Sequence, residues 1–249
     1  MPRYEVIGVS GIGEVRPGDD IARLIVDAAA RQGTPLAAGD LLVIGQKIVS
    51  KAEGRLVKLA DVQPSAIALA MAPGLAKDPR LVEVILSESR RVVRMDKGVL
   101  ITETHHGWIC ANAGIDQSNV DADSVALLPE DSDRSARAVR ERVRALAAIE
   151  VFVIITDTFG RPWRDGLVEF ALGVSGFEPL LDLRGTQDLQ GRELHHTVVA
   201  VADELAAAAG LVMEKGAAVP AVIIRGYQFV PAEGDGKKLI RPADADLFR

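Results

Sequence analysis

Residues 151–166, with the sequence VFVIITDTFGRPWRDG, join an apolar run to a group of charged and polar side chains. The run predicts a buried strand that ends at Asp157 and Thr158. An unpaired carboxylate at the end of a buried strand is costly, so a cation must compensate Asp157. That cation is either a divalent metal ion, bound by carboxylate and hydroxyl oxygens, or the guanidinium group of Arg161 or Arg164.

A second acidic segment, NAGIDQSNV, places Asp116 and Asn119 shortly after another apolar stretch. Oxygen ligands from Asp116, Asp157 and the Thr158 hydroxyl group are of the type that Mg²⁺ and Mn²⁺ prefer. We therefore predict that Asp116 and Asp157 share one metal ion in the folded protein. Asp and Asn also build turns by bonding to their own backbone, and this alternative remains open for Asp116 and Asn119.

Two further segments have the composition of anion-binding sites. The segment GIGEVRPGDD has two glycines near its start, which let backbone N–H groups approach a ligand ahead of a predicted helix. The segment GQKIVSKAEGR places Lys47, Lys51 and Arg55 four residues apart at the end of an apolar strand, where cations bind phosphate or carboxylate. A plain turn also explains the first segment, and solvated surface cations explain the second.

The hydrophobic pattern predicts the elements that position these residues. Helices are predicted at residues 17–33, with Asp19 or Asp20 as the cap, after Pro79, at 129–149 and at 196–216. Strands are predicted within 39–51 before a polar turn, on both sides of a turn at His105 to Gly107, over most of 167–185, and after Pro220. Strands and helices do not alternate strictly, so we predict an α+β fold with a mixed, irregular sheet and flanking helices. One domain over residues 1–249 would contain all of it.

Composition excludes several classes of protein. The net charge of −6 argues against a broad nucleic-acid-binding surface. The apolar runs are too short for a membrane span, and the N-terminal residues lack the pattern of a secretory signal. A single cysteine, Cys110, fits a reducing compartment, and we expect a cytoplasmic protein.

The segments GIGEVRPGDD, QKIVSKAEGR, AGIDQSNV, ITDTFGRPWRDG and VIIRG, in this order, resemble the coenzyme F420-0:L-glutamate ligase family. The resemblance spans nearly the whole chain. It implies an enzyme that uses GTP and divalent cations to add L-glutamate, through amide bonds, to the terminal carboxylate of a deazaflavin coenzyme precursor. It also implies an α+β fold completed as an intertwined homodimer. Some relatives carry a further nitroreductase-like domain, and we expect only the ligase part here.

The resemblance also implies roles for individual residues. The implied GTP contacts are Ile12, Gly13, Glu14, Val15, Gln46, Lys51 and Asn119. Two ions of Mg²⁺ or Mn²⁺ are implied, one held by Asp116 and Asp157 and the second by Thr158, with K⁺ as a further ion. Separately from the resemblance, we propose that Arg161 and Arg164, beside Asp157, hold carboxylates of the coenzyme tail or of the incoming glutamate.

The chain departs from the family pattern at two places. Gly13 stands where the family often has proline, which leaves the turn more flexible but still able to present N–H groups. Archaeal members have a glycine- and acid-rich loop near Met213, whereas this chain has MEKGAAVP. Either Glu214 replaces the metal-binding acid of that loop from a shifted position, or Lys215 contacts the phosphates, with Gly216 beside it.

The chemistry that these residues must support is amide formation from a carboxylate, which requires activation. Transfer of the GTP γ-phosphoryl group would give an acyl phosphate, which the amine of glutamate then attacks. Two alternatives remain: a small-molecule kinase that uses the same metal site, and a protein that binds the nucleotide without turnover.

Overall fold

The computed structural model describes residues 3–213, 216 and 218–246. At its centre is a five-stranded sheet, and only the β2–β8 neighbours are parallel within it. In spatial order its strands are β1 (Glu5–Val9), β12 (Ala221–Arg225), β2 (Leu41–Gly45), β8 (Phe152–Arg161) and β9 (Arg164–Ser175). The sheet is therefore mixed, as the sequence predicted.

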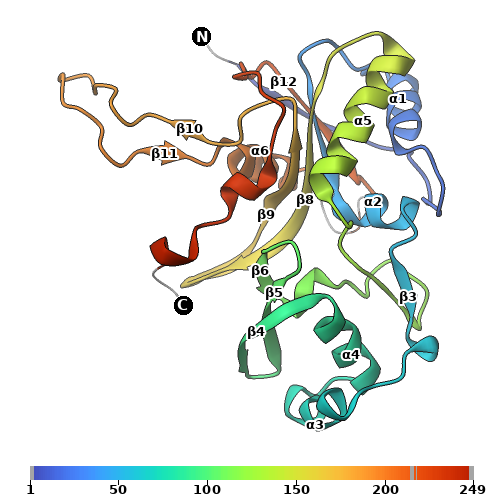
Figure 1. The fold of residues 1–249 in the computed structure, drawn as a ribbon. Coiled ribbons are helices and arrows are strands. Elements are labelled where there is room, and N and C mark those ends of the chain that lie inside the picture. The colour runs from blue at the N-terminus through green and yellow to red at the C-terminus, as the bar shows by residue number, and fades with distance from the viewer. Residues whose placement is uncertain (1–2, 214–215, 217, 247–249) are drawn as a thin grey trace.

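Helices cover both faces of this sheet (Figure 1). One core cluster contains Leu42 and Ile44 with residues of α1 (Ile21–Arg31), α2 (Gln46–Ala52) and α5 (Ser132–Ala147). The other contains Leu41 and Val43 with residues of α6 (Val201–Gly210). Successive side chains of a strand point to opposite faces, so the central strands need apolar residues at every position.

A smaller lobe lies between α2 and α5 in the sequence and below the main sheet in Figure 1. It has its own apolar core, built mainly by the helices and by strands β5 and β7. Its elements are β3 (Leu56–Lys58), η1 (Leu59–Asp61), α3 (Ala66–Leu75), α4 (Pro79–Ser87), β4 (Ser89–Asp96), β5 (Val99–Thr104), β6 (Ile109–Ala111), η2 (Asn112–Gly114) and β7 (Ser124–Ala126).

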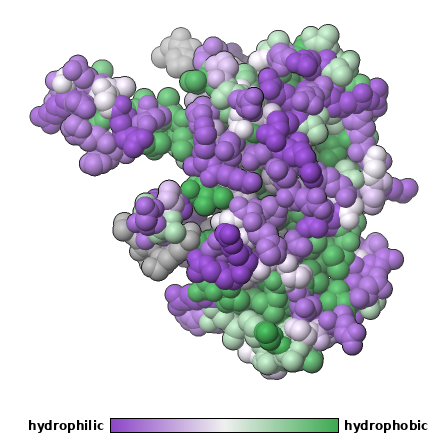
Figure 2. Space-filling view, in the orientation of Figure 1, coloured by the Kyte–Doolittle hydropathy of each residue, from purple (hydrophilic) through white to green (hydrophobic). Residues whose placement is uncertain are grey.

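An arm between β9 and α6 projects from the main sheet (Figure 1). Its base is the pair β10 (Leu181–Asp182) and β11 (Val198–Val199), and the chain finishes with η3 (Gly236–Leu239) and η4 (Ala243–Ala245). Figure 2 shows a polar surface over most of the arm and an apolar surface over the smaller lobe. In that lobe Ile67 and Leu69 of α3 are exposed.

Most predicted elements are confirmed, and so is the α+β class. Asp20 caps α1 by accepting a hydrogen bond from the Arg23 backbone N–H, and α5 lies inside its predicted range. The predicted polar turn after β2 is wrong, because residues 46–52 form α2. The strand of the opening segment does not end at Asp157 and Thr158 but continues to Arg161.

Candidate functional site at the junction of the two lobes

The parallel pair β2–β8 creates the edge at which the site lies. Gly45, the last residue of β2, is paired with Thr156 of β8. Helix α2 begins directly after Gly45, which is its N-cap, so no turn separates strand and helix. Lys47 on α2 and Asp157 on β8 therefore start from the same edge of the sheet, one or two residues beyond the last paired positions.

Asp157 is a carboxylate that has no ion-pair partner among the residues that the structure describes. The pKa of its carboxyl group is raised to about 7, mainly by burial and in addition by the negative charges of Glu169 and Asp116. A hydrogen bond from the backbone N–H of Thr158 and the charge of Lys47 oppose the shift. Over the described residues Asp157 forms no ion pair, so the alternative in which Arg161 or Arg164 neutralises it is wrong.

Asp116 reaches the same place from the smaller lobe. Its backbone N–H and C=O both pair with Ala126, which fixes the residue against β7. Its carboxylate lies 2.7 Å from Lys47 Nζ and accepts a hydrogen bond from the Ser118 backbone N–H at 2.7 Å. Burial raises the pKa of Asp116, but the bonds from Lys47 and Ser118 outweigh burial and hold this pKa below its ordinary value.

The backbone that leads to Asp116 is strained. Asn112, Ala113 and Gly114 are consecutive left-handed residues, with φ of 53°, 55° and 70°. Ala113 is buried, and left-handed backbone is unfavourable for alanine because its Cβ approaches a carbonyl oxygen. Such strain persists only where the surrounding structure imposes it, and here it directs the chain from β6 back toward Asp116.

Thr158 lies on the other face of β8 from Asp157. Its hydroxyl group donates to Glu169 Oε1 at 2.6 Å, and the Thr156 hydroxyl group donates to Glu169 Oε2 at 2.9 Å. Glu169 stands opposite Thr158 on β9 and was not predicted as a site residue. The sequence could have indicated Glu169, because an acid at the centre of an apolar strand needs polar partners on the neighbouring strand of the hairpin.

The remaining acid in the predicted metal site, Glu214, lies outside the described residues, and so does Lys215. Met213, which precedes them, lies close to Gly45, where an added Cβ would come within 3.2 Å of Met213 Cε. Gly216 is described and has φ of +125°. Within the described part of the chain, no group of three or more His, Cys, Asp or Glu side chains has the arrangement of a metal site.

Lys51 connects α2 with the first glycine-containing segment. It lies one helical turn after Lys47, is almost fully buried, and its Nζ is 2.6 Å from Glu14 Oε1. The neighbouring side chains of Ile12 and Val15 are buried in the main core, so a ligand at this loop would meet their backbone.

Three other residues were predicted as nucleotide contacts: Gly13, Gln46 and Asn119. Gly13 has φ of +81° and open space where a Cβ would be. Gln46 is buried at the start of α2, and its Oε1 accepts a hydrogen bond from Ser50 Oγ at 2.8 Å. Asn119 is exposed in the loop after Asp116, with φ of +56°.

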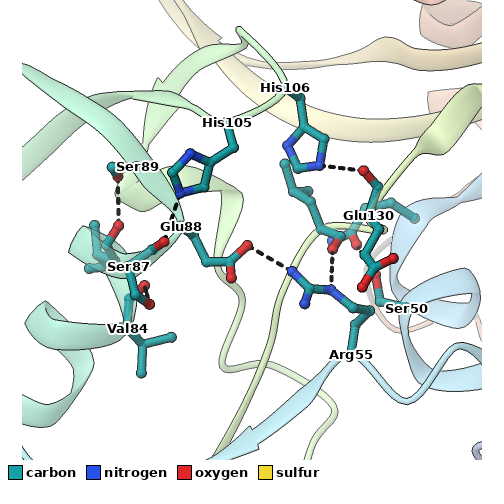
Figure 3. Close-up of polar contacts among 12 residues, drawn as sticks. Ser50, Arg55, Val84, Ser87, Glu88, Ser89, His105, His106 and Glu130 are labelled. Atoms are coloured by element: carbon teal, nitrogen blue, oxygen red, sulfur yellow. Dashed lines mark hydrogen bonds and ion pairs between the residues drawn. The ribbon is translucent and has the colours of Figure 1, made fainter.

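Arg55, the third cation of the α2 segment, has a structural role. Figure 3 shows it where the chain enters the smaller lobe, with its guanidinium group directed at Glu88. Arg55 Nη2 is 2.7 Å from Glu88 Oε2, and Arg55 Nε donates to the Leu128 carbonyl oxygen at 3.0 Å. Nearby, His106 Nε2 forms a hydrogen bond with the Glu130 carbonyl oxygen at 2.9 Å. These bonds join the segments that enter and leave the lobe, so Arg55 is not available for phosphate.

Arg161 and Arg164 flank the turn of the β8–β9 hairpin. Arg161 Nη2 donates to the Asp165 carbonyl oxygen at 2.7 Å, whereas its buried Nε has no acceptor within the described chain. A shallow cavity of about 430 Å³ lies beside Arg161, bounded by β9, β11 and the start of α6, and Asp203 is part of its wall. Arg164 is exposed. Arg161 thus retains unused hydrogen-bonding capacity next to a cavity.

Comparison with known proteins identifies the family to which this arrangement belongs. The family model described as F420-0:Gamma-glutamyl ligase matches residues 11–226. The chain belongs to this family. It is 49% identical over 247 residues to the coenzyme F420:L-glutamate ligase of Methanothermobacter thermautotrophicus, covering 98% of each chain. It is 48% identical over 254 residues to the ligase of the same name from Methanopyrus kandleri, covering 100% of this chain and 99% of the other.

A third relative, the coenzyme F420:L-glutamate ligase of Archaeoglobus fulgidus, is 42% identical over 248 residues, or 99% of this chain and 97% of the relative. The predictions of the family and of a ligase as the enzyme class are confirmed. Among the helices that the structure describes, none combines the length and the apolar character of a membrane span.

Proposed function

We propose that this ligase adds L-glutamate, through an amide bond, to the terminal carboxylate of coenzyme F420-0, at the expense of GTP, and then adds further γ-linked glutamates. The observation that carries the proposal is Asp157: a partly buried carboxylate that has no ion-pair partner among the described residues, is coupled to Asp116 and lies near Lys47 of α2. Membership of the F420-0:gamma-glutamyl ligase family supports the choice of substrates.

The donor set suits a hard divalent cation, because Asp116 and Asp157 offer carboxylate oxygens from two lobes at one junction. We assign one Mg²⁺ or Mn²⁺ ion to this pair. A second ion would be held by Thr158 and Glu214, and Glu169 brings another carboxylate to Thr158. A K⁺ ion is proposed in addition. A bound divalent cation would neutralise negative charge on the phosphate oxygens.

GTP is proposed to bind along α2 and the loops that meet it. The backbone of residues 12–15 would present N–H groups to the phosphates, and Lys51 would leave Glu14 to bind them. The remaining proposed nucleotide contacts are Gln46, Asn119, Lys215 and Gly216.

The reaction takes place in two steps. A carboxylate oxygen of the coenzyme bonds to the γ-phosphorus of GTP as the bond from that phosphorus to the β,γ-bridging oxygen breaks, which releases GDP. The amine nitrogen of glutamate then bonds to the acyl carbon, inorganic phosphate leaves, and the amine loses one proton. Because both reactants are anionic, Lys51 and the bound cations would reduce the repulsion between them.

Arg161 and Arg164 are proposed to hold substrate carboxylates. Arg161 is the stronger assignment, since its guanidinium group has no acidic partner in the described chain and borders a cavity. Arg161→Lys should raise the KM for glutamate or coenzyme about tenfold and leave GTP affinity unchanged, because an ammonium group cannot bind a carboxylate through two parallel bonds. Unchanged KM values for both substrates would make Arg161 a structural residue of the hairpin.

Mass spectrometry tests the function as a whole. After incubation with F420-0, GTP, Mn²⁺ and glutamate, each ligation should increase the coenzyme mass by one glutamyl unit. A phosphorylated coenzyme that accumulates without amide formation would identify a kinase. Bound GTP with no change in either small molecule would identify a nucleotide-binding protein.

We also propose a cytoplasmic homodimer. The projecting arm and strand β9 carry exposed apolar side chains, Leu189 on the arm and Leu167 on β9. Light scattering coupled to size-exclusion chromatography would give twice the chain mass for a dimer and the single-chain mass if the proposal is wrong.

A further inference from the structure

Lys47 makes two contacts at the proposed metal site. Its Nζ lies 2.7 Å from Asp116 Oδ2 and 2.6 Å from Ser118 Oγ, and its charge also lowers the pKa of Asp157. Lys47 belongs to α2 on the main sheet, whereas Asp116 and Ser118 belong to the smaller lobe. The ammonium group therefore supplies positive charge to both acids across the junction.

We propose that Lys47 is the internal counter-cation of this site: it pairs with Asp116 in the metal-free protein and is displaced from Asp116 when a divalent cation binds. This inference rests on the proposed function, which places the cation at Asp116 and Asp157. It assigns Lys47 a role that differs from a direct contact with metal, since an ammonium group and a metal ion compete for the same carboxylate oxygen.

Charge and geometry together support exchange. One ammonium group cannot neutralise two carboxylates, and Lys47 Nζ is bonded to Asp116 and Ser118 and forms no ion pair with Asp157 among the described residues. A divalent cation supplies the missing charge. It would compete with the Lys47 ammonium group for the Asp116 carboxylate and weaken the ion pair between Lys47 and Asp116. The side chain is about one fifth exposed, so it has room to turn away.

The displaced ammonium group would remain beside the nucleotide. Lys47 and Lys51 lie one turn apart on the same side of α2, and Lys51 is itself paired with Glu14 in the nucleotide-free protein. Displacement would thus present two ammonium groups on one helix face to the GTP phosphates. Metal binding would prepare nucleotide binding, and the two ligands would bind cooperatively.

The test is Mn²⁺ binding to the nucleotide-free protein, measured by electron paramagnetic resonance, for wild type, Lys47→Met and Lys58→Met. Lys58 is exposed and forms no ion pair in the described chain, so Lys58→Met is a control for the change in net charge. Lys47→Met should bind Mn²⁺ about tenfold more tightly than wild type, because it loses the competing cation. Lys58→Met should match wild type.

Calorimetric titration with a non-hydrolysable GTP analogue at saturating Mn²⁺ gives the second readout. Lys47→Met should bind the analogue about tenfold more weakly, so the two affinities change in opposite directions. A purely structural link between the lobes would instead lower the melting temperature of Lys47→Met and leave Mn²⁺ affinity unchanged or weaker. That result would overturn the inference.

Two further variants keep the outcomes separable. Ser118→Ala removes one of the two Lys47 contacts without changing charge, and should tighten Mn²⁺ binding about twofold even if Lys47→Met does not fold. Asp157→Asn should abolish Mn²⁺ binding at the site. If wild type and Asp157→Asn bind Mn²⁺ equally, the proposed metal site fails, and the exchange fails with it. If only the Lys47 and Ser118 results fail, the metal site stands and the exchange is wrong.

Discussion

An aspartate lies near each end of strand β2, Asp40 buried and Asp157 partly buried, and only Asp40 has a cationic partner among the described residues. Asp40, just before β2, is 1% exposed and is bound by Arg225 through two bonds, Nε–Oδ1 at 2.8 Å and Nη2–Oδ2 at 2.7 Å. The Ala37 backbone N–H donates a third bond to it at 2.7 Å. Asp157, beyond the other end, has no cationic partner in the described chain, and its pKa is raised to about 7.

This difference separates a structural carboxylate from a candidate functional one. The fold supplies Asp40 with its own cation in a bidentate arrangement, which the geometry of a guanidinium group favours. Near Asp157, by contrast, lie the carboxylates of Glu169 and Asp116, and the nearby Lys47 is paired with Asp116. A buried charge without a counter-ion lowers the stability of the fold. Proteins retain such charges mainly at sites where a ligand supplies the opposite charge.

The largest expected effect is loss of activity in Asp157→Asn. Removing the carboxylate should lower kcat about a thousandfold, because bound metal and aligned phosphate are lost together. Asp116→Asn should behave similarly and raise the Mn²⁺ concentration needed for half-maximal rate. The double variant should be little worse than either single one, since groups that act on one ion are not additive.

Steady-state rates across a Mn²⁺ titration, with thermal melts in parallel, decide this. Multiplicative losses with an unchanged Mn²⁺ requirement would show that the two aspartates do not share an ion.

Asp40→Ala should show the reverse pattern. It should lower the free energy of unfolding by about 3 kcal/mol, because it leaves Arg225 without its carboxylate, and it should leave the Mn²⁺ dependence of the folded enzyme unchanged. Urea denaturation measures the first quantity. Asp27→Ala is the control, because Asp27 is exposed on α1 and has no ion pair among the described residues. An Asp40 variant as stable as the control would remove the distinction between the two ends of β2.

The pH dependence of stability should reveal Asp157 directly. Its folded-state pKa is raised from 3.8 to about 7, so the folded state holds the proton more tightly than the unfolded state. The resulting stabilisation is full below the unfolded-state pKa and is lost as pH rises toward 7. Between pH 5 and pH 8 the metal-free protein should therefore lose about 2 to 3 kcal/mol from this group.

Denaturation of wild type and Asp157→Asn at several pH values, with metal removed by a chelator, tests this prediction. The variant should lack this part of the pH dependence, and Mn²⁺ should restore wild-type stability at pH 8. Parallel pH profiles for the two proteins would contradict the assignment.

The smallest expected effect belongs to Glu169→Gln. The substitution keeps one acceptor for the hydroxyl groups of Thr156 and Thr158 and removes a negative charge near Asp157. Activity should fall about fivefold, as expected for one weakened hydrogen-bonded pair. The pKa of Asp157 should fall, so the pH transition of the metal-free protein should move to lower pH. A transition at unchanged pH would show that Glu169 does not act on Asp157.

The sequence predicted that Asp116 and Asp157 lie close together, but it did not predict the local structure around them. Asp116 and Asp157 could be associated because both follow apolar stretches, and in the structure their charges interact with each other and with that of Lys47. That they share a metal ion stays a prediction. The segment of helix α2 was predicted as a polar turn because Gly45 and polar residues follow the apolar run of β2. Its apolar residues Ile48, Val49 and Ala52 have helical spacing, but seven residues are too few for a clear periodic signal.

Two other features could not be predicted from the pattern. Helix α3 has the sequence AIALAMAPGL, which is apolar on every side and includes Pro73, so amphipathic periodicity does not identify it. The opposite orientations of Asp157 and Thr158 follow from the continuation of β8 to Arg161. A predicted strand end at Asp157 left those orientations undefined, because residues beyond a strand need not alternate.

The hydrogen bonds between the segments that enter and leave the smaller lobe have a consequence for how the chain folds. Strands β2 and β8 are adjacent and parallel, although Leu41 and its partner Phe152 are more than a hundred residues apart in sequence. The Leu127 backbone N–H donates to the Arg55 carbonyl oxygen at 3.0 Å, so a folded small lobe already has its two ends together. Once that lobe has formed, pairing β8 with β2 requires closure of a much shorter loop, with a smaller loss of chain entropy. Early folding of the lobe that carries Asp116 would therefore speed the pairing that creates the edge on which Asp157 lies.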